Sequence, residues 1–284
     1  MTDSSLGIEP LELLHEEPGL PDFDLPPVIR ALYSGTLGFD RPSLFVNFVS
    51  TIDGIVSIPA TPRSNRMIGD NSDADRFVMG LLRACADVVL ISSGTLNGSP
   101  KGVWAAADAY PPAATAIAEL RRRLGRPREP AFAVLTASGS IDPEHRALEA
   151  GALILTTKRG AAVLAGRLRD GVETVVLPGE DKVDLAAAVE FLHGRGLTAI
   201  LSEAGPTILG AMLAAGLVDE LFLTVSPLVA GRSGTSVRLG LVEDIDLLPT
   251  MRVAGQLRGV RRHGAHLFLR YGLARSVELV ESDD

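Results

Sequence analysis

The most informative stretch of the sequence places a carboxylate, Glu203, beside a loop of small residues. The preceding segment 197–201 (LTAIL) is short, apolar and partly β-branched, which predicts a strand buried on both faces. The loop 203–207 (EAGPT) then predicts a tight turn into a helix over 208–215. Small residues let the backbone approach a ligand, and the free N–H groups of a first helical turn attract an anion. The pattern therefore favours a phosphate group, although a simple turn with a helix cap would use the same residues.

Three further loops with small or hydroxyl side chains follow predicted strands, at 92–95 (SSGT), 136–139 (TASG) and 156–159 (TTKR). The carboxyl ends of parallel strands line one rim of a sheet, so these loops can converge with the loop described above on one extended ligand. Hydroxyl groups, backbone N–H groups and the cations Lys158 and Arg159 are appropriate partners for a dinucleotide with several phosphates. A contact of Lys158 or Arg159 with a 2′-phosphate would favour NADP over NAD. Each loop taken alone is also ordinary turn sequence.

Asp53 is a second carboxylate that follows a predicted strand, which covers residues 44–50. Asp53 followed by Gly54 is a common turn signal. A carboxylate beside a nucleotide would instead orient a polar ring or relay a proton. The residues alone leave the structural and the catalytic interpretation of Asp53 open.

Other common catalytic and binding motifs are missing. There is no G-x-G-x-x-G after the first predicted strand, no G-x-x-x-x-G-K-[ST] and no G-x-S-x-G. The single cysteine, Cys85, lies in an apolar helical segment, which predicts a small buried side chain and excludes an intramolecular disulfide. No two histidines have the spacing of a metal pair, so we expect solvated or structural roles for them and no metal site. The five histidines are His15, His145, His193, His263 and His266.

The composition describes an acidic globular protein of 284 residues, with 46% hydrophobic and 22% charged residues and a formal net charge of −8. A nucleic-acid partner is not expected, because phosphate-backbone binding needs a basic surface. The one basic run, 121–128 (RRRLGRPR), is interpreted as a solvated helix end. No apolar run of about 18 residues and no secretory signal pattern occur, so we expect a cytoplasmic protein without a membrane partner.

The elements that would position these residues alternate between strand and helix along most of the chain. This alternation predicts an α/β fold with a mostly parallel mixed sheet flanked by helices and an antiparallel hairpin at the C-terminus, joined through 261–264. Ser72 is expected to cap a helix whose first turn holds Asp73 and Asp75. Strands are predicted at 43–50, 87–92, 131–136, 152–157, 172–178, 197–201, 219–227, 251–260 and 265–272, helices at 73–86, 115–124, 143–151, 160–170, 184–196 and 208–215, and loops at 57–72, 93–102 and 228–250.

The domain organisation is predicted to be simple. Residues 43–272 contain no linker, which favours one domain. The proline-rich segment 1–42 is expected to drape over the fold as an N-terminal extension with one short helix, Pro27–Tyr33, because repeated prolines prevent a long helix or a central strand. Residues 273–284 are expected to form a C-terminal tail.

Three blocks in a fixed order carry a resemblance to a known family. They are NFVSTIDG (47–54), a block with Asp75-Arg76-Phe77, Leu82-Arg83-Ala84 and Gly94-Thr95, and a block from Glu203-Ala204-Gly205-Pro206 to Ser226-Pro227. Together they resemble the pyrimidine reductases of riboflavin biosynthesis, the C-terminal reductase module of a bifunctional deaminase–reductase with a dihydrofolate-reductase-like fold. Over about residues 43–272 the chain is similar to stand-alone versions of this module, because the H-x-E and P-C-x-x-C motifs of the zinc deaminase half are missing.

The resemblance implies transfer of a hydride from NADPH to the ribosylamino carbon of a phosphorylated aminopyrimidine, which opens the ribose to a ribityl chain. It also implies a homodimer that acts on a small-molecule substrate. The cofactor would supply the hydride, so the protein has to hold the reacting carbons together and exclude water. Asp53 and Glu203 are the predicted catalytic residues. The predicted cofactor-binding residues are Ser93, Gly94, Thr95, Thr136, Thr157, Lys158, Ala204, Gly205, Pro206 and Thr207, and the predicted substrate-binding residues are Asn47, Ser50 and Arg83.

Several positions depart from the family pattern. Several of the lost groups bind substrate in the family, including its phosphate, while Arg83 is kept as a phosphate partner. Two alternatives therefore stay open: another pterin or pyrimidine-like substrate with the same cofactor, or a non-catalytic NADP-binding dimer, against which the presence of both Asp53 and Glu203 argues. The departures are Ile55 in place of a frequent lysine, Met67-Ile68-Gly69 in place of Trp-Ile-Thr, Gly98-Ser99-Pro100 in place of an acidic pair before proline, and Glu203-Ala204-Gly205 in place of Glu-Gly-Gly.

Overall fold

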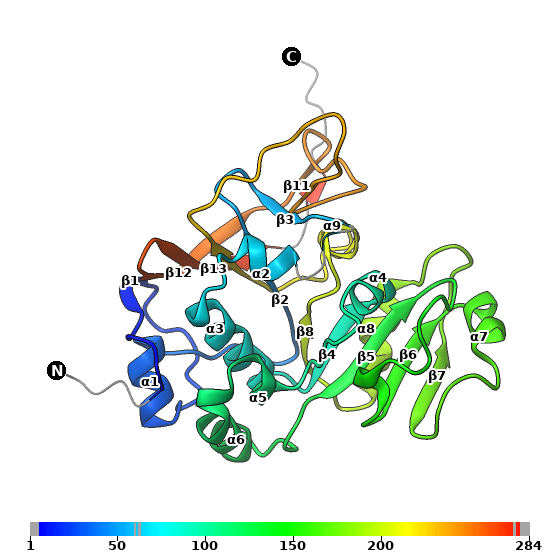
Figure 1. Ribbon diagram of the computed structural model, residues 1–284, viewed down its shortest axis with the longest axis horizontal. Coiled ribbons are helices and arrows are strands. Elements are labelled where there is room, and N and C mark those ends of the chain that lie inside the picture. The colour runs from blue at the N-terminus through cyan, green and yellow to red at the C-terminus, as the bar shows by residue number, and fades with distance from the viewer. Residues whose placement is uncertain (1–5, 60, 62–63, 275–276, 279–284) are drawn as a thin grey trace.

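A ten-stranded mixed sheet organises the computed structural model, which describes residues 6–59, 61, 64–274 and 277–278 (Figure 1). Its strands are β1 (Glu12–Glu16), β2 (Ser43–Ser50), β4 (Val88–Ser92), β5 (Ala131–Thr136), β6 (Ala152–Thr156), β7 (Val172–Val176), β8 (Ala199–Ser202), β9 (Glu220–Val225), β12 (Gly255–His263) and β13 (His266–Leu273). The strand order is β1-β12-β13-β9-β2-β8-β4-β5-β6-β7. From β9 to β7 all neighbours run parallel, whereas β13, β12 and β1 are antiparallel additions. The predicted α/β fold with a C-terminal antiparallel hairpin is confirmed.

Helices cover both faces of the sheet, because the parallel strands carry apolar side chains on both sides. The helices are α1 (Pro27–Tyr33), α2 (Ser64–Ile68), α3 (Asp73–Ala84), α4 (Ser93–Asn97), α5 (Ala106–Ala109), α6 (Ala114–Arg123), α7 (Lys158–Leu164), α8 (Leu185–Gly194) and α9 (Pro206–Ala214), with 3-10 turns η1 (Pro111–Ala113) and η2 (Arg146–Leu148). Phe45 and Ile91 share one core with residues of α3 and α6, whereas their chain neighbours Val46 and Leu90 share a second core with residues of α8 and α9. Successive strand residues point to opposite faces, so each strand contributes to both cores.

Two short two-stranded sheets pair β3 (Ile55–Ser57) with β10 (Leu239–Gly240) and β11 (Met251–Arg252) with β14 (Val277–Glu278). They lie near the carboxyl end of β2 and the C-terminal hairpin in Figure 1. Among the described helices, none is both long and apolar enough to cross a bilayer.

Three segments predicted as loops contain short elements, and those predictions are wrong there. The predicted loop 93–102 begins with α4, because Ser92 caps this helix: its Oγ accepts a hydrogen bond from the Thr95 amide at 3.2 Å. The predicted loop 57–72 contains α2, and the predicted loop 228–250 contains β10. Elements of two to five residues are too short to show a hydrophobic period.

The helix predicted over 143–151 is also wrong, since only the 3-10 turn η2 forms there. Side chains bond to the local backbone instead: Asp142 accepts from the Glu144 amide at 3.0 Å, and His145 Nδ1 accepts from the Ala147 amide at 3.1 Å. The C-terminal hairpin turns later than predicted, because β12 continues to His263, which pairs with His266.

The N-terminal segment is packed into the fold. β1 pairs with β12 at the edge of the sheet, and Leu11, Leu25 and Leu37 are buried. The predicted short helix Pro27–Tyr33 is confirmed as α1.

The basic run 121–128 is not a solvated helix end throughout, which corrects the prediction. Arg121 is 1% exposed, and its Nη1 donates to the carbonyls of Ala84 and Ala86 at 3.0 and 2.8 Å, at the C-terminal end of α3. Arg126 bonds Asp87 through a 2.8 Å ion pair. These buried arginines satisfy carbonyl and carboxylate groups at the end of the sheet opposite the predicted site.

Candidate active site

The carboxyl ends of β8, β4, β5 and β6 lie side by side, because these strands are consecutive neighbours in the parallel part of the sheet. The loops after them therefore occupy one rim, as predicted. Chain order reverses between β4 and β8, and such switch points are where open α/β sheets bind ligands. Three strand spacings separate the first loop from the last, a span of about 14 Å. The rim is long enough for an extended ligand.

Glu203, a predicted catalytic residue, forms a buried pair with Arg83 of α3. Arg83 Nε donates to Glu203 Oε1 at 3.0 Å, and Arg83 Nη2 donates to Oε2 at 2.7 Å. The side chains of Arg83 and Glu203 are 7% and 12% exposed. This bidentate pair of hydrogen bonds fixes the orientation of both side chains and occupies one edge of the Arg83 guanidinium. A substrate phosphate bound by Arg83, as predicted, would therefore share the guanidinium with Glu203.

Asp75 is a buried carboxylate near this pair, and no site role was predicted for it. It lies in the first turn of α3, where the predicted cap is present: the Asp75 amide donates to Ser72 Oγ at 3.2 Å. Burial raises the pKa of Asp75 to about 6, even though a hydrogen bond with Thr224 and the nearby His266 act in the opposite direction. The signal in the sequence was its position on the apolar face of the helix, three residues before Val78, where a carboxylate is unexpected.

Asp53, the other predicted catalytic residue, anchors a loop. Its Oδ1 accepts hydrogen bonds from the Thr51 hydroxyl at 2.6 Å and from the Ala230 amide at 3.0 Å, and its Oδ2 accepts from the Gly231 amide at 2.8 Å. These bonds, led by that of Thr51, lower the pKa of Asp53 to about 2. Asp53 is therefore ionised at neutral pH, which supports an orienting role and argues against a proton relay.

Gly205 shapes the loop after β8 through a backbone conformation with φ 90° and ψ 168°, which side chains with a Cβ rarely adopt. It precedes α9, whose N-terminus has no side-chain cap and whose first residue, Pro206, has no N–H group. The remaining amides of that first turn are oriented as an anion site requires. A Cβ at Gly205 would lie 3.6 Å from Thr95 Oγ1, so the loops after β8 and β4 are adjacent. These features fit a dinucleotide phosphate.

The other predicted cofactor residues differ in their burial and in their hydrogen bonds. Thr136 and Thr157 are buried, and their hydroxyls bond the backbone of their own rim: Thr136 accepts from Gly139 at 3.1 Å, and Thr157 donates to Ala137 at 2.7 Å. Ser93, Gly94 and Thr95 lie in α4, Ala204 is buried, and the exposed Thr207 donates to Asp244 at 3.2 Å. Direct contacts of these side chains with a cofactor stay predictions.

The two basic residues at the far end of the rim are both exposed. Lys158 is the first residue of α7, and Arg159 follows it. Arg159 forms a surface ion pair with Asp181 at 3.3 Å, whereas Lys158 has no ion pair among the described residues. Lys158 is therefore the better placed of the two to bind a phosphate.

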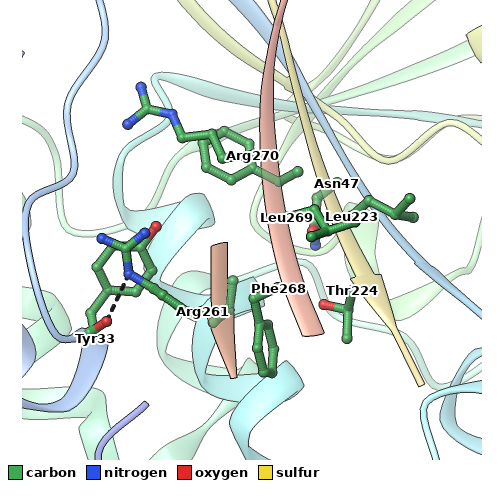
Figure 2. A pocket seen from close by; sticks show the side chains of 10 residues that line it. Tyr33, Asn47, Leu223, Thr224, Arg261, Phe268, Leu269 and Arg270 are labelled. Carbon is green, nitrogen blue, oxygen red and sulfur yellow. Dashed lines mark hydrogen bonds between the residues drawn. The ribbon is translucent and has the colours of Figure 1, made fainter. Parts of the chain in front are cut away.

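The predicted substrate residues Asn47 and Ser50 point to opposite faces of the sheet, because three positions separate them on β2. Asn47 lines a pocket together with Thr224 of β9 and Val78 of α3, as Figure 2 shows for the two strand residues. Because Thr224 also bonds Asp75, Asn47 lies on the face that holds Asp75. Asn47 therefore lies on the same face of the sheet as Asp75 of α3, whereas Ser50 points to the opposite face.

Two arginines on the wall of this pocket have structural partners (Figure 2). Arg261 stacks over the Tyr33 ring, 3.9 Å from its centroid, and bonds Glu16. Arg270 pairs with the buried Glu220 at 2.7 Å. Both guanidinium groups are thus held by carboxylates, and Glu220 is shared between Arg270 and Arg258. Among the described residues, no group of three possible metal ligands gathers anywhere.

Comparison with known proteins identifies relatives of this chain. The RibD C-terminal domain family matches residues 42–262. The 2,5-diamino-6-ribosylamino-4(3H)-pyrimidinone 5′-phosphate reductase of Archaeoglobus fulgidus is 26% identical over 201 residues, which cover 69% of this chain and 86% of that protein. A pyrimidine reductase-like protein of Corynebacterium diphtheriae superposes with a TM-score of 0.61 at 22% identity, over 82% of this chain and 92% of that one.

A bifunctional relative shares the fold as well. The diaminohydroxyphosphoribosylaminopyrimidine deaminase/5-amino-6-(5-phosphoribosylamino)uracil reductase of Thermotoga maritima superposes with a TM-score of 0.56 at 17% identity, over 82% of this chain and 57% of that chain. The family match spans all three sequence blocks, from the strand that holds Asn47 through Arg83 to the loop of Glu203. The chain therefore belongs to the RibD C-terminal domain family, as the resemblance implied.

Proposed function

We propose that this chain is an oxidoreductase of riboflavin biosynthesis that reduces the ribosylamino carbon of a phosphorylated aminopyrimidine with a nicotinamide cofactor. The observation that carries the proposal is the family match over residues 42–262. The archaeal relative, which is named as such a reductase and aligns over 86% of its own length, supports it. The pair of Glu203 and Arg83, at the switch point of the sheet, marks the proposed reacting end.

NADPH is the proposed cofactor. The loop conformation at Gly205, the uncapped start of α9 and the length of the rim fit a dinucleotide. When bound, the nicotinamide would supply the hydride. Lys158, exposed at the far end of the rim, is proposed to bind the 2′-phosphate that distinguishes NADPH from NADH.

The chain's own residues are proposed to orient the reactants and exclude water. Glu203 and Arg83 hold each other in one geometry, so that either can present a fixed hydrogen-bonding edge to the substrate. Asp53 fixes the segment after β9 against the turn after β2 through the amides of Ala230 and Gly231. Beneath the rim, the apolar side chains of the two cores pack against the two faces of the sheet.

A different pterin or pyrimidine-like substrate is the second candidate, and Ile55 favours it. Ile55 is fully buried in β3, at a position where the bifunctional enzymes often carry a lysine. This position therefore offers no charge to a substrate phosphate. A non-catalytic NADP-binding dimer is the third alternative. A homodimer and a cytoplasmic location stay predictions based on the family and the composition.

The first experiment is a thermal-shift titration of the purified protein with NADPH, with NADH and without ligand. A site filled at 100 times Kd adds about 2.7 kcal/mol to the free energy of unfolding. We expect a shift with NADPH, followed by NADPH oxidation when the phosphorylated aminopyrimidine is added and by a ribityl product in mass spectrometry. A shift without turnover on any aminopyrimidine would favour the non-catalytic alternative, and no shift with either nucleotide would contradict the cofactor proposal.

A further inference from the structure

The carboxylate of Asp75 stands close to the carboxyl ends of β2 and β9. Thr224, whose hydroxyl bonds Asp75, pairs with Val49 of β2 on one side and with Phe268 of β13 on the other. Figure 2 shows Thr224 and Phe268. A Cβ built on Gly69 would lie 3.5 Å from Asp75 Oδ2 and 3.5 Å from Val49 Cγ2. The carboxylate therefore lies over the sheet at the edge where the turn of Asp53 begins.

Asp75 is also near the proposed reacting end. The negative charge of Glu203 raises the pKa of Asp75, and Asp75 precedes Arg83 by about two turns of the same helix. A surface hollow between α2 and α3 leads to it, lined by Asn65, Gly69, Asn71 and Arg76. Asp75 itself also lines this hollow, which opens to the surface.

Internal contacts use little of the hydrogen-bonding capacity of Asp75. Thr224 supplies one hydrogen bond, and His266 acts through its charge while its Nε2 lies 3.1 Å from the Gly69 carbonyl. Arg76, the next residue, pairs with Asp73 at 3.1 Å instead. An ionised carboxylate accepts about four hydrogen bonds, and burial is costly when they are not made. Within the described part of the chain, Thr224 is thus the one side chain that hydrogen-bonds Asp75, which leaves the carboxylate capacity to accept further bonds.

The names of two relatives contain two different substrate rings. These rings differ at one position, where a carboxylate can distinguish them by hydrogen bonding. The Archaeoglobus protein is named for a 2,5-diamino-4(3H)-pyrimidinone, and the Thermotoga protein for a 5-aminouracil. The first ring presents two adjacent donors, N3–H and the 2-amino group. The second presents N3–H beside an acceptor, O2. An ionised carboxylate accepts from both donors of the first ring and repels the lone pairs of O2 in the second.

Resting on the proposed reductase function, we propose that Asp75 binds the N3–H and 2-amino edge of the substrate ring and so selects the diaminopyrimidinone over the aminouracil. A buried site built for two such bonds rejects a ring that lacks one donor by roughly 100-fold or more. An amide in the same place would donate to O2 and accept from N3–H. Asp75→Asn is therefore expected to move the preference toward the aminouracil.

The surroundings of Asp75 set the pH range of this selection. Burial raises the pKa of Asp75 to about 6, and Glu203 from the loop after β8 acts in the same direction. Thr224 of β9 and His266 of β13 oppose this rise. Above that pKa, Asp75 is ionised and accepts both hydrogen bonds.

The test compares kcat/KM on the two phosphorylated rings for wild type, Asp75→Asn and Asp73→Asn, with NADPH and with NADH, at a pH above the pKa of Asp75. Asp73 is the matched control, because it lies in the same helical turn but its side chain is 54% exposed. We expect wild type and Asp73→Asn to prefer the diaminopyrimidinone by roughly 100-fold, and Asp75→Asn to lose or reverse this preference. Asp75→Glu, which keeps the charge, should keep the direction of the preference.

The outcomes separate this inference from the function on which it rests. Equal kcat/KM of wild type on the two rings, or an equal loss on both in Asp75→Asn, would overturn the inference and leave the reductase function standing. A wild-type protein that reduces neither ring would overturn the proposed function and this inference with it. Thermal unfolding of Asp75→Asn tests whether a folding defect is the cause, and equal kcat/KM of wild type on the two rings overturns the inference even if that variant does not fold.

Discussion

The two ends of the rim are built from different chemistry. At the end formed by β5 and β6, neutral hydroxyls such as those of Thr136 and Thr157 bond the backbone of their own loops. At the end formed by β8 and α3, buried charges face one another, with Arg83 bonded to Glu203 and Asp75 close by. Neutral turn contacts contribute about 1 kcal/mol each, whereas breaking a buried ion pair costs several times more. We therefore expect substitutions at the end formed by β8 and α3, called here the charged end, to change stability and activity more than substitutions at the end formed by β5 and β6.

The largest effect is expected for Arg83→Met. It leaves the carboxylate of Glu203, 12% exposed, without its partner, so the free energy of unfolding should fall by about 3–5 kcal/mol. Urea unfolding measures this change. The double variant Arg83→Met/Glu203→Met should recover much of the stability but not the reductase activity. Additive effects in this double-mutant cycle would mean that the pair is not coupled and would remove the distinction between the two ends.

Gly205→Ala should have the next largest effect, because Gly205 lies at the charged end, two residues after Glu203, and shapes the loop that leads into α9. A side chain at φ 90° costs about 1–3 kcal/mol, and the first turn of α9 would move away from its ligand position. We expect the Kd for NADPH, measured by calorimetry, to rise by at least about tenfold. Gly196→Ala is the control, since Gly196 also has a positive φ of 77° but open space around it. Equal Kd values for the two variants would contradict a role of the Gly205 loop in cofactor binding.

Asp53→Asn should have a smaller effect, because Asp53 is exposed and acts on the loop at Ala230 and Gly231. We expect kcat/KM to fall by about tenfold through a looser loop. The hydrogen bonds lower the pKa of Asp53 from 3.8 to about 2, so its contribution to stability is complete above the unfolded value and is lost as the pH falls through the folded one.

The pH dependence of unfolding gives Asp53 an independent check. Wild type should lose stability between about pH 4 and pH 2 relative to Asp53→Asn, and the difference should be constant at higher pH. A step in the wild-type pH–rate profile near neutrality that disappears in Asp53→Asn would instead show that Asp53 titrates during turnover. That result would restore the proton-relay interpretation.

The same contrast explains how much could be predicted from the sequence. The rim loops were predictable because strand periodicity and turn residues are local, and the sheet order then brings 92–95, 136–139 and 156–159 together. The charged end depends on contacts between distant residues. Glu203 and Arg83 were both selected, but their ion pair follows only from the packing of α3 against β8. Asp75 was predicted only to lie in the first turn of the helix that Ser72 caps, although its place on the apolar face was visible in the sequence.

The smallest effect is expected at the end formed by β5 and β6, for Lys158→Gln. Lys158 is exposed, and surface charges are screened by salt, so the preference for NADPH over NADH should fall only about three- to tenfold at low ionic strength and less at high salt. Arg167→Gln removes an equally exposed charge beyond the far end of α7 and should leave the ratio unchanged. If Lys158→Gln also leaves the ratio unchanged, Lys158 does not bind the 2′-phosphate, and Arg159 is the remaining cation to test at this end. If the double variant Lys158→Gln/Arg159→Gln leaves the ratio unchanged as well, no cation at the end formed by β5 and β6 binds the 2′-phosphate, which would sharpen its contrast with the charged end at Glu203.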